Sequence, residues 1–174
     1  MGLVCAFSRI ISRAMLQNMQ ALDGYDLCLL DALQRDGSLS RSDLAQKVGL
    51  SESQAARRRQ ALERAGLIKR YRAELDAGAL GFSLTAFVHV KLHGHSKGNA
   101  KRFADLVRKT LSILEAHAVT GDFDYLLKAR VADLQGLQRL INDVLLAHPT
   151  VDRVRSEIVL ETLREDQLLE FVST

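Results

Sequence analysis

A cluster of positive charge between Ser51 and Arg72 is the feature of this sequence with the clearest chemical meaning. These 22 residues carry seven basic side chains against Glu52 and Glu63, a net charge of +5. A local excess of this size is typical of a surface that contacts a polyanion such as a nucleic acid. Residues 77–174 do not share it, since they hold 12 basic and 12 acidic residues. From charge alone, a solvated helix face remains the alternative interpretation.

The residue types in this window match the chemistry of DNA recognition. Ser, Gln and Arg form hydrogen bonds with base edges in the major groove, whereas Lys and Arg neutralise phosphates. The residues that we assign to DNA binding are Ser51, Ser53, Gln54, Arg57, Arg58, Arg59, Lys69, Arg70 and Arg72. Of these, we expect Ser53, Gln54 and Arg58 to approach base edges. We expect phosphate contacts from Arg57, Arg58, Lys69, Arg70 and Arg72.

The spacing of apolar residues predicts three helices that position this window. Residues 22–33 carry an amphipathic helical stripe. Ser40 opens a second, short helix, which Gly49 ends because glycine accepts the left-handed backbone of a sharp turn. Ser51 opens a third helix through an S-x-x-Q capping box, and this helix runs to about Ala65. Such an order is the helix-turn-helix pattern, in which the amino end of the last helix favours phosphate.

Residues 67–72 alternate roughly as a strand and predict a small basic wing after the third helix. Helix-turn-helix geometry also occurs in proteins that never touch DNA. The charge of the window is what favours DNA binding here.

The carboxyl-terminal two thirds of the chain predict a different fold. Leu84–Leu92 alternates as a half-buried strand, with its even-numbered residues on one face and Phe87, His89 and Lys91 on the other. The order β-α-β-β-α-β is that of the ferredoxin-like fold. The further expected elements are a helix with Phe103, Leu106, Val107 and Leu111 inward, strands at 113–120 and 124–131, a helix from Asp133 to His148, and a strand at 151–162. The fold class is therefore α+β, with a winged helix-turn-helix domain followed by a ferredoxin-like domain.

Other chemistry finds little support in the sequence. Cys5 and Cys28 form no C-x-x-C pair, and no P-loop, G-x-S-x-G or dinucleotide motif is present. His89, His93 and His95 share a parity and offer a metal site as an alternative, but we expect ordinary surface histidines. No apolar stretch reaches 18 residues. We therefore expect a cytoplasmic protein that is not an enzyme and holds no metal or cofactor.

Residues 1–20 are expected to be an N-terminal extension without a function of their own. Arg9 and Arg13 interrupt the apolar run that a signal peptide requires. The segment is either a short helical arm or precedes a true start at Met15 or Met19. The boundaries that we expect after it are a helix-turn-helix domain at 21–70, a linker or wing strand at 71–81, and the ferredoxin-like domain at 82–174.

From Leu22 to about Glu165 the chain resembles the leucine-responsive/AsnC family of bacterial and archaeal transcription regulators. The resemblance is carried by LDGYDLCLLDALQRDG from Leu22, by AQKVGLSESQAARRRQALERAGLIKRY from Ala45 and, most specifically, by VTGDFDYLLKARV from Val119. It implies a regulator whose second domain senses an amino acid or related metabolite, dimerises by sheet packing and assembles into octamers. The implied partners are double-stranded DNA, further copies of the chain and the effector, with no membrane.

The resemblance also implies an effector site between neighbouring dimers. The residues assigned to it are Thr120, Gly121, Asp122, Phe123, Asp124, Tyr125 and Leu134. Two carboxylates at a hairpin tip can bind a ligand ammonium, and free backbone N–H groups can hold its carboxylate. The alternative is that both aspartates are simply turn residues. Leu134 would supply an apolar wall.

Two departures from the family pattern and two alternative functions stay open. Glu52 stands where the family often has Pro, and Arg59 stands where it usually has an apolar residue. Arg59 is expected either to extend outward from the core or to contact phosphate. The alternative functions are a tetrapyrrole (siroheme-type) decarboxylase of similar two-domain build and an effector-independent DNA-organising protein.

Overall fold

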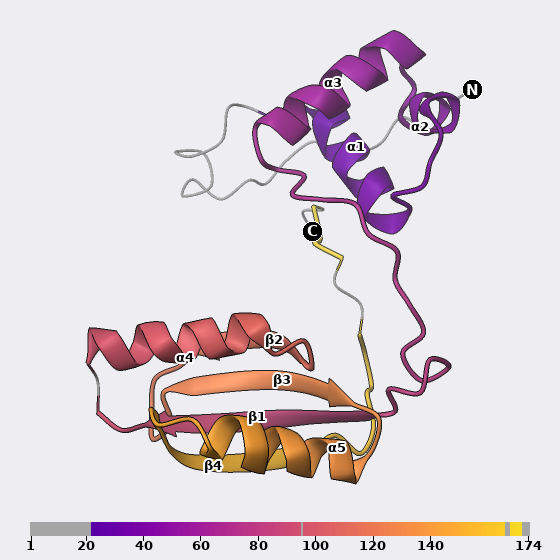
Figure 1. Ribbon diagram of the computed structural model, residues 1–174. Helices are drawn as coiled ribbons and strands as arrows, with labels where there is room; N and C mark the ends of the chain where they lie inside the picture. Colours follow the sequence, from indigo (N-terminus) through magenta and orange to yellow (C-terminus); the bar gives the residue numbers. More distant parts are fainter. Residues whose placement is uncertain (1–21, 95, 166–167, 172–174) are drawn as a thin grey trace. The chain divides into compact units, whose positions relative to one another are not determined.

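The computed structural model describes residues 22–94, 96–165 and 168–171, which form two compact units (Figure 1). Among these residues, the first unit consists of 22–74 with Glu165 and 168–171, and the second is Leu75–Arg164. The grouping of the C-terminal segment differs from the expected domain 82–174. Its contact with the first unit is specific: Gln34 Nε2 donates to the Leu169 carbonyl at 2.8 Å, and the Leu169 N–H donates to Gln34 Oε1 at 2.9 Å.

The first unit contains three helices, α1 (Gly24–Arg35), α2 (Arg41–Val48) and α3 (Glu52–Arg64). Their ends follow the local sequence. Ser40 caps α2 by accepting a hydrogen bond from the Asp43 N–H, and Gly49 ends it with φ of 72°. The predicted box at the start of α3 is complete. The helix-turn-helix prediction is thereby confirmed.

A small core joins the three helices. Leu29 of α1, Leu44 of α2 and Ala55 of α3 are almost fully buried at its centre. Because Ala55 is small, α3 can approach its neighbours closely. Cys28 is half-buried at the edge of this core.

The strand expected at residues 67–72 is not formed, so this prediction of a wing strand was wrong. Within the described part of the first unit, no strand is available to pair with it. The N–H groups of Leu67 and Ile68 instead donate to the Leu62 carbonyl and close the end of α3. Ile68 packs partly against the helical core. The basic segment therefore leaves α3 as an extended loop.

The second unit is one four-stranded antiparallel sheet with helices. The elements are β1 (Leu84–Leu92), α4 (Lys97–Lys109), β2 (Ile113–Ala118), β3 (Tyr125–Val131), α5 (Leu134–Arg139), the π-helical continuation η1 (Leu140–Leu146) and β4 (Val151–Ile158). The strands lie side by side in the order β2-β3-β1-β4, which together with the order of the elements along the chain confirms the ferredoxin-like βαββαβ prediction.

The core of this unit lies on one face of the sheet. Val88 and Val90 of β1 are fully buried there, together with Phe103 of α4 and Leu137 of α5. Both helices thus cover the same face, as the alternation of β1 predicted. The opposite face, which includes Phe87, stays open in the single chain.

Three details of the second unit differ from expectation. Strand β4 ends at Ile158 rather than residue 162, because its partner β1 begins at Leu84 and the Val159 N–H already bonds to the Thr85 carbonyl. The predicted helix after Asp133 changes to π-helical bonding halfway along. Leu111, expected to face inward, is 91% exposed because α4 has already ended.

Replacing Phe103 by Ala tests where the core of the second unit lies. Loss of a fully buried ring should lower the free energy of unfolding by about 3–5 kcal/mol. Urea denaturation of the variant gives this value. The matched control is Leu111→Ala just beyond the same helix, which should stay within about 0.5 kcal/mol of the parent. Equal effects of the two substitutions would contradict the described packing.

Candidate nucleic-acid interface and ligand pocket

Helix α3 presents one polar face to solvent. Ser53 and Arg57, both assigned to DNA binding, lie on it and are exposed. Gln60 and Arg64 extend the same face but were missing from the residues that the sequence assigned to DNA. Their signal was the helical spacing, because positions i, i+4, i+7 and i+11 share one face.

Arg58 is engaged with α1. Its Nη1 lies 2.7 Å from Asp23 Oδ2 and 2.9 Å from Asp26 Oδ1, and its guanidinium lies 5.5 Å from the centre of the Tyr25 ring. The hydrogen bond with Asp26 raises the pKa of Arg58, against a smaller opposing effect of burial. The side chain that we expected near base edges thus joins α3 to α1.

Arg59 was expected either to extend outward from the core or to contact phosphate, but in the structure its side chain contacts Glu63 and Tyr71. It is half-buried, its Nε donates to Glu63 Oε1 at 3.0 Å, and its guanidinium stacks 4.6 Å from the centre of the Tyr71 ring. The Tyr71 hydroxyl donates to the same Glu63 oxygen at 3.0 Å. Arg59, Glu63 and Tyr71 therefore hold the basic loop that follows α3 beside the helix.

The pKa values of this triad reflect its contacts. The hydrogen bond from Arg59 holds the pKa of Glu63 below its ordinary value of 4.5, and the bond from Tyr71 adds to this effect. Burial and the bond to Glu63 raise the pKa of Tyr71 above 10.0. Burial lowers the pKa of Arg59, but its ionised and hydrogen-bonded neighbours raise it overall. The charged forms of Arg59 and Glu63 are thus the stable ones near neutral pH.

The other residues assigned to DNA binding either cap α3 or lie on the basic loop that follows it. Ser51 and Gln54 cap the helix: the Ser51 N–H donates to Gln54 Oε1 at 3.1 Å, and the Gln54 N–H donates to Ser51 Oγ at 3.3 Å. Lys69 and Arg70 are exposed on the loop and make no ion pair with any described residue. Arg72 is exposed as well.

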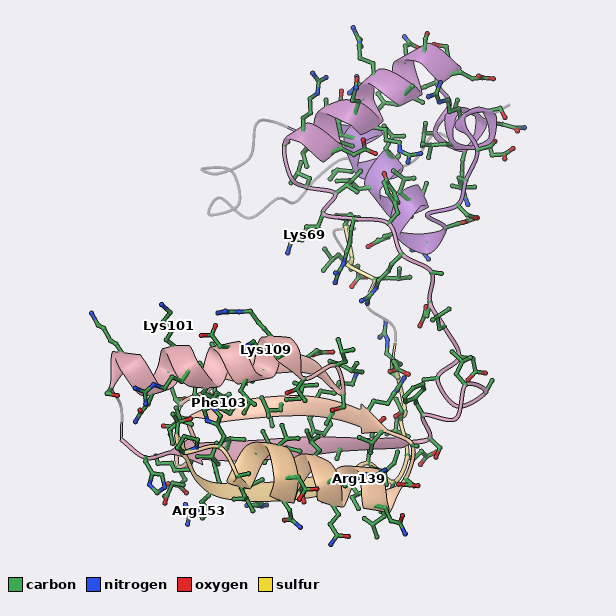
Figure 2. The ribbon with its side chains drawn as sticks, viewed as in Figure 1. Lys69, Lys101, Phe103, Lys109, Arg139 and Arg153 are labelled. Carbon is green, nitrogen blue, oxygen red and sulfur yellow. The ribbon has the colours of Figure 1, made fainter. Side chains whose placement is uncertain are left out.

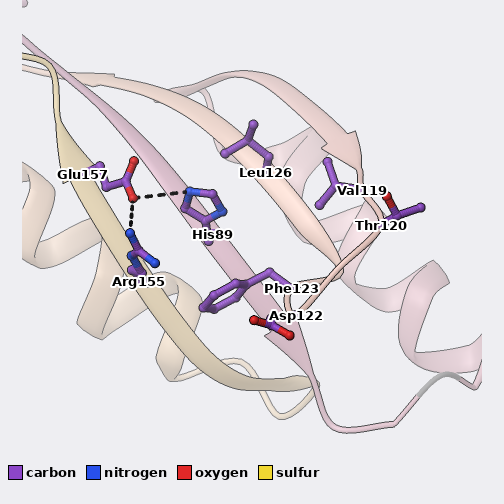
Figure 3. A pocket seen from close by; sticks show the side chains of 8 residues that line it. All are labelled: His89, Val119, Thr120, Asp122, Phe123, Leu126, Arg155 and Glu157. Atoms are coloured by element: carbon purple, nitrogen blue, oxygen red, sulfur yellow. Dashed lines mark hydrogen bonds and ion pairs between the residues drawn. The ribbon is translucent and has the colours of Figure 1, made fainter.

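The second unit has a cavity of about 380 Å³ on the open face of its sheet (Figure 3). Part of the wall comes from the β2–β3 loop and part from the strands beside it. Of the assigned effector residues, Thr120, Asp122 and Phe123 line it. The other lining residues, which the sequence did not assign, are His89, Val119, Leu126, Arg155 and Glu157.

The remaining assigned effector residues lie elsewhere. Asp124 accepts a hydrogen bond from the Leu92 N–H at 2.8 Å, so this carboxylate holds the loop against the end of β1. Tyr125 packs on the Phe103 ring at 4.7 Å, on the core side of the sheet. Gly121 makes the turn with φ of 115°. Leu134 is 62% exposed at the start of α5 and does not line this cavity.

A row of polar side chains crosses the sheet at the cavity. His89 is paired in register with Leu126 on one side and Arg155 on the other. Glu157 Oε1 lies 2.6 Å from Arg155 Nη2 and 3.8 Å from His89 Nε2. The sequence signal for these residues was the shared parity on the open face of the strands. The cavity thus combines both signs of charge with apolar walls.

The histidines considered for a metal site have separate surroundings. His89 faces Glu157, whereas His93 Nδ1 lies 3.4 Å from Asp152 Oδ1. His95 lies outside the described residues. Within the described ranges, no group of three or more His, Cys, Asp or Glu side chains is arranged to hold a metal ion. None of the helices in those ranges is long and apolar enough to cross a membrane.

Comparison with known proteins matches both units. Residues 22–69 match the family model for winged helix-turn-helix DNA-binding, and residues 85–169 match that for the Lrp/AsnC ligand binding domain. The leucine-responsive regulatory proteins of Klebsiella pneumoniae and Escherichia coli K12 are each 38% identical over 148 residues. These alignments cover 85% of this chain and 90% of each relative.

Solved structures of transcriptional regulators are similar to this chain. A transcriptional regulator from Neisseria meningitidis, determined as a complex with L-Met, superposes with a TM-score of 0.83 at 34% identity, over 86% of this chain and 97% of that one. An AsnC family transcriptional regulator from Agrobacterium tumefaciens gives 0.81 at 32% identity, with coverage of 86% and 97%. A helix-turn-helix joined to a ligand-binding domain defines the class of DNA-binding, effector-responsive transcription regulators. The chain belongs to the Lrp/AsnC family.

The substitution Glu63→Gln tests the contacts that hold the basic loop. Because folding lowers the pKa of Glu63, its charge stabilises the folded state above pH 4.5, and this contribution is lost as the pH falls through the lowered pKa. The variant should therefore melt below the parent at pH 7, and the difference should shrink below about pH 4. Thermal melts at both pH values measure this. Glu74→Gln, at an exposed position of the same unit, should show no such pH-dependent difference.

Proposed function

We propose that the exposed face of α3 enters the major groove of DNA while the cavity on the open sheet face binds an amino acid. The observation that carries the first part is the position of Arg57. It is exposed on a capped helix and pairs with no described residue, beside a loop with further cations. A major groove of roughly 12 Å admits such a helix.

Within this proposal the polar and basic residues have three roles. Ser53 approaches base edges, and Gln60 extends this row. Phosphate contacts come from Arg57, Arg64, Lys69, Arg70 and Arg72. Arg58 and Arg59 position the surface from behind, through α1 and through Tyr71.

The chemistry of the cavity suits an amino acid. Asp122 offers a carboxylate for the ligand ammonium, and Arg155 offers a cation for the ligand carboxylate. Phe123 and Leu126 provide an apolar surface for a side chain. The complex of the Neisseria regulator with L-Met supports this ligand class.

The open sheet face also supports assembly into a homo-oligomer. Phe87 is 37% exposed there, and Leu114 at the edge strand is 52% exposed. A second copy would cover such a surface, consistent with a dimer and with octamers built from dimers. DNA as the partner implies a cytoplasmic protein, and we assign no catalytic role. A decarboxylase would have no use for the exposed cations of α3.

Substitutions of the neighbouring residues Arg57 and Arg58 distinguish a role in DNA contact from a role in packing. Arg57→Ala should weaken DNA binding and make the slope of log K against log salt shallower by about 1, with an unchanged melting temperature. Arg58→Ala should lower stability by on the order of 1 kcal/mol, because Asp23 and Asp26 lose their partner. Fluorescence anisotropy with duplex DNA over a range of salt concentrations measures the first effect. Unchanged DNA affinity of Arg57→Ala would refute the assignment.

Thermal shift against the common amino acids tests the cavity. A ligand at 100 times its Kd should stabilise the protein by about 2.7 kcal/mol. Asp122→Asn should abolish the shift, whereas Asp143→Asn, exposed in η1, should preserve it. The size of the oligomer should be followed in parallel by light scattering. If no amino acid raises the melting temperature, an effector-independent DNA-organising protein becomes the better description.

A further inference from the structure

Helix α4 of the ligand-binding domain carries a second cationic surface. Its inner side consists of Phe103, which is buried, with Leu106 and Val107 packed against the sheet core. Figure 2 shows Lys101 and Lys109 pointing away from the sheet while Phe103 points toward it. The outward side chains of α4 are Lys97, Lys101, Arg102, Asp105, Arg108 and Lys109. We call this surface the α4 basic face.

The charge of the second unit is segregated. Residues 75–164 hold 12 basic and 10 acidic side chains, so the unit looks nearly neutral in the sequence. Five of the basic residues and only one acidic residue lie on α4, a net charge of +4 within 13 residues. The rest of the unit is therefore net negative by two charges. The folding of one helix gathers the excess cations onto one side of the domain.

Most of these cations are available to a partner. Arg108 pairs with Asp105 at 2.8 Å, with the Arg108 side chain exposed and the Asp105 side chain about half exposed. Lys97, Lys101, Arg102 and Lys109 make no ion pair with any described residue. From Lys97 to Lys109 the row extends about 18 Å along the helix, which is about half a turn of duplex DNA.

We propose that the α4 basic face contacts the phosphate backbone of duplex DNA, as a second and sequence-independent site outside the helix-turn-helix. This inference rests on the proposed DNA binding by α3, which brings the duplex to the same molecule and raises its local concentration. Because the α4 basic face has a net charge of +4, its charge is complementary to that of a polyanion. Because its large apolar side chains point inward, it lacks the exposed apolar surface with which a membrane-binding helix inserts. The one amide side chain of α4, Asn99, donates to the His93 carbonyl, which leaves the Lys and Arg side chains of this face for phosphate contacts.

The test compares two variants that change the net charge equally. Lys101→Gln combined with Lys109→Gln removes two charges from the α4 basic face. The control Arg139→Glu makes the same change at an exposed position of α5. The probe is a mixed-sequence duplex of about 150 base pairs, and Kd is measured from about 50 to 200 mM salt. Light scattering follows the oligomer size of each protein.

The expected result is specific to the α4 variant. Its salt slope should be shallower by about 1 for each lysine that contacts a phosphate, and its affinity at about 50 mM salt should fall about tenfold on any sequence. Arg139→Glu should stay within about twofold of the parent. Affinity of the α4 variant equal to that of the parent overturns the inference. So does a loss of affinity that accompanies a smaller oligomer, which would make α4 a contact between copies.

The Arg57→Ala variant separates this inference from the proposed function. If Arg57→Ala loses binding while the α4 variant keeps it, α3 alone contacts DNA and only the α4 inference fails. If the parent protein does not bind DNA at all, the proposed function fails as well.

Discussion

The orientation of α3 depends on one ion-pair cluster between helices. Arg58 reaches back to Asp23 and Asp26 of α1, at 2.7 and 2.9 Å. Ala55, one turn earlier on α3, is fully buried in the helical core. If α3 rotated about its axis, these carboxylates would lose their partner, at a cost on the order of 1 kcal/mol, and a polar face would be buried in place of Ala55, which costs more. Arg57 is therefore left on the side that faces solvent.

The second unit is governed by a different constraint, the burial of only one face of its sheet. Helices α4 and α5 both pack on that face, so the cavity and the open strands lie on the other. The same arrangement turns the charged side of α4 away from the sheet core. One domain thereby has an open sheet face that contains a cavity of about 380 Å³ and, on the side of the helices, a cationic helix.

Much of the fold could be predicted from the sequence, whereas only part of the candidate site could be. The capping residue Ser51 marked the start of α3, and the alternation of Leu84–Leu92 identified the buried face of β1. Residues that the sequence assigned to one function have different surroundings in the structure. Asp122 lines the cavity, but Asp124 of the same motif bonds to the backbone of β1. A motif shows which residues lie at a turn, but it does not show which of them the rest of the chain will engage.

The sequence by itself determined the helices, the four strands of the sheet, their order along the chain and the positive charge of Ser51–Arg72. These follow from periodicity and capping, which act within a few residues along the chain. Tertiary structure alone decided that Arg58 binds α1, that His89 and Arg155 share a cavity, and that the basic loop has no strand partner. Those outcomes depend on contacts between distant residues: 32 positions separate Arg58 from Asp26. Packing brings such residues together, and sequence patterns that span a few residues do not indicate which distant residues will come into contact.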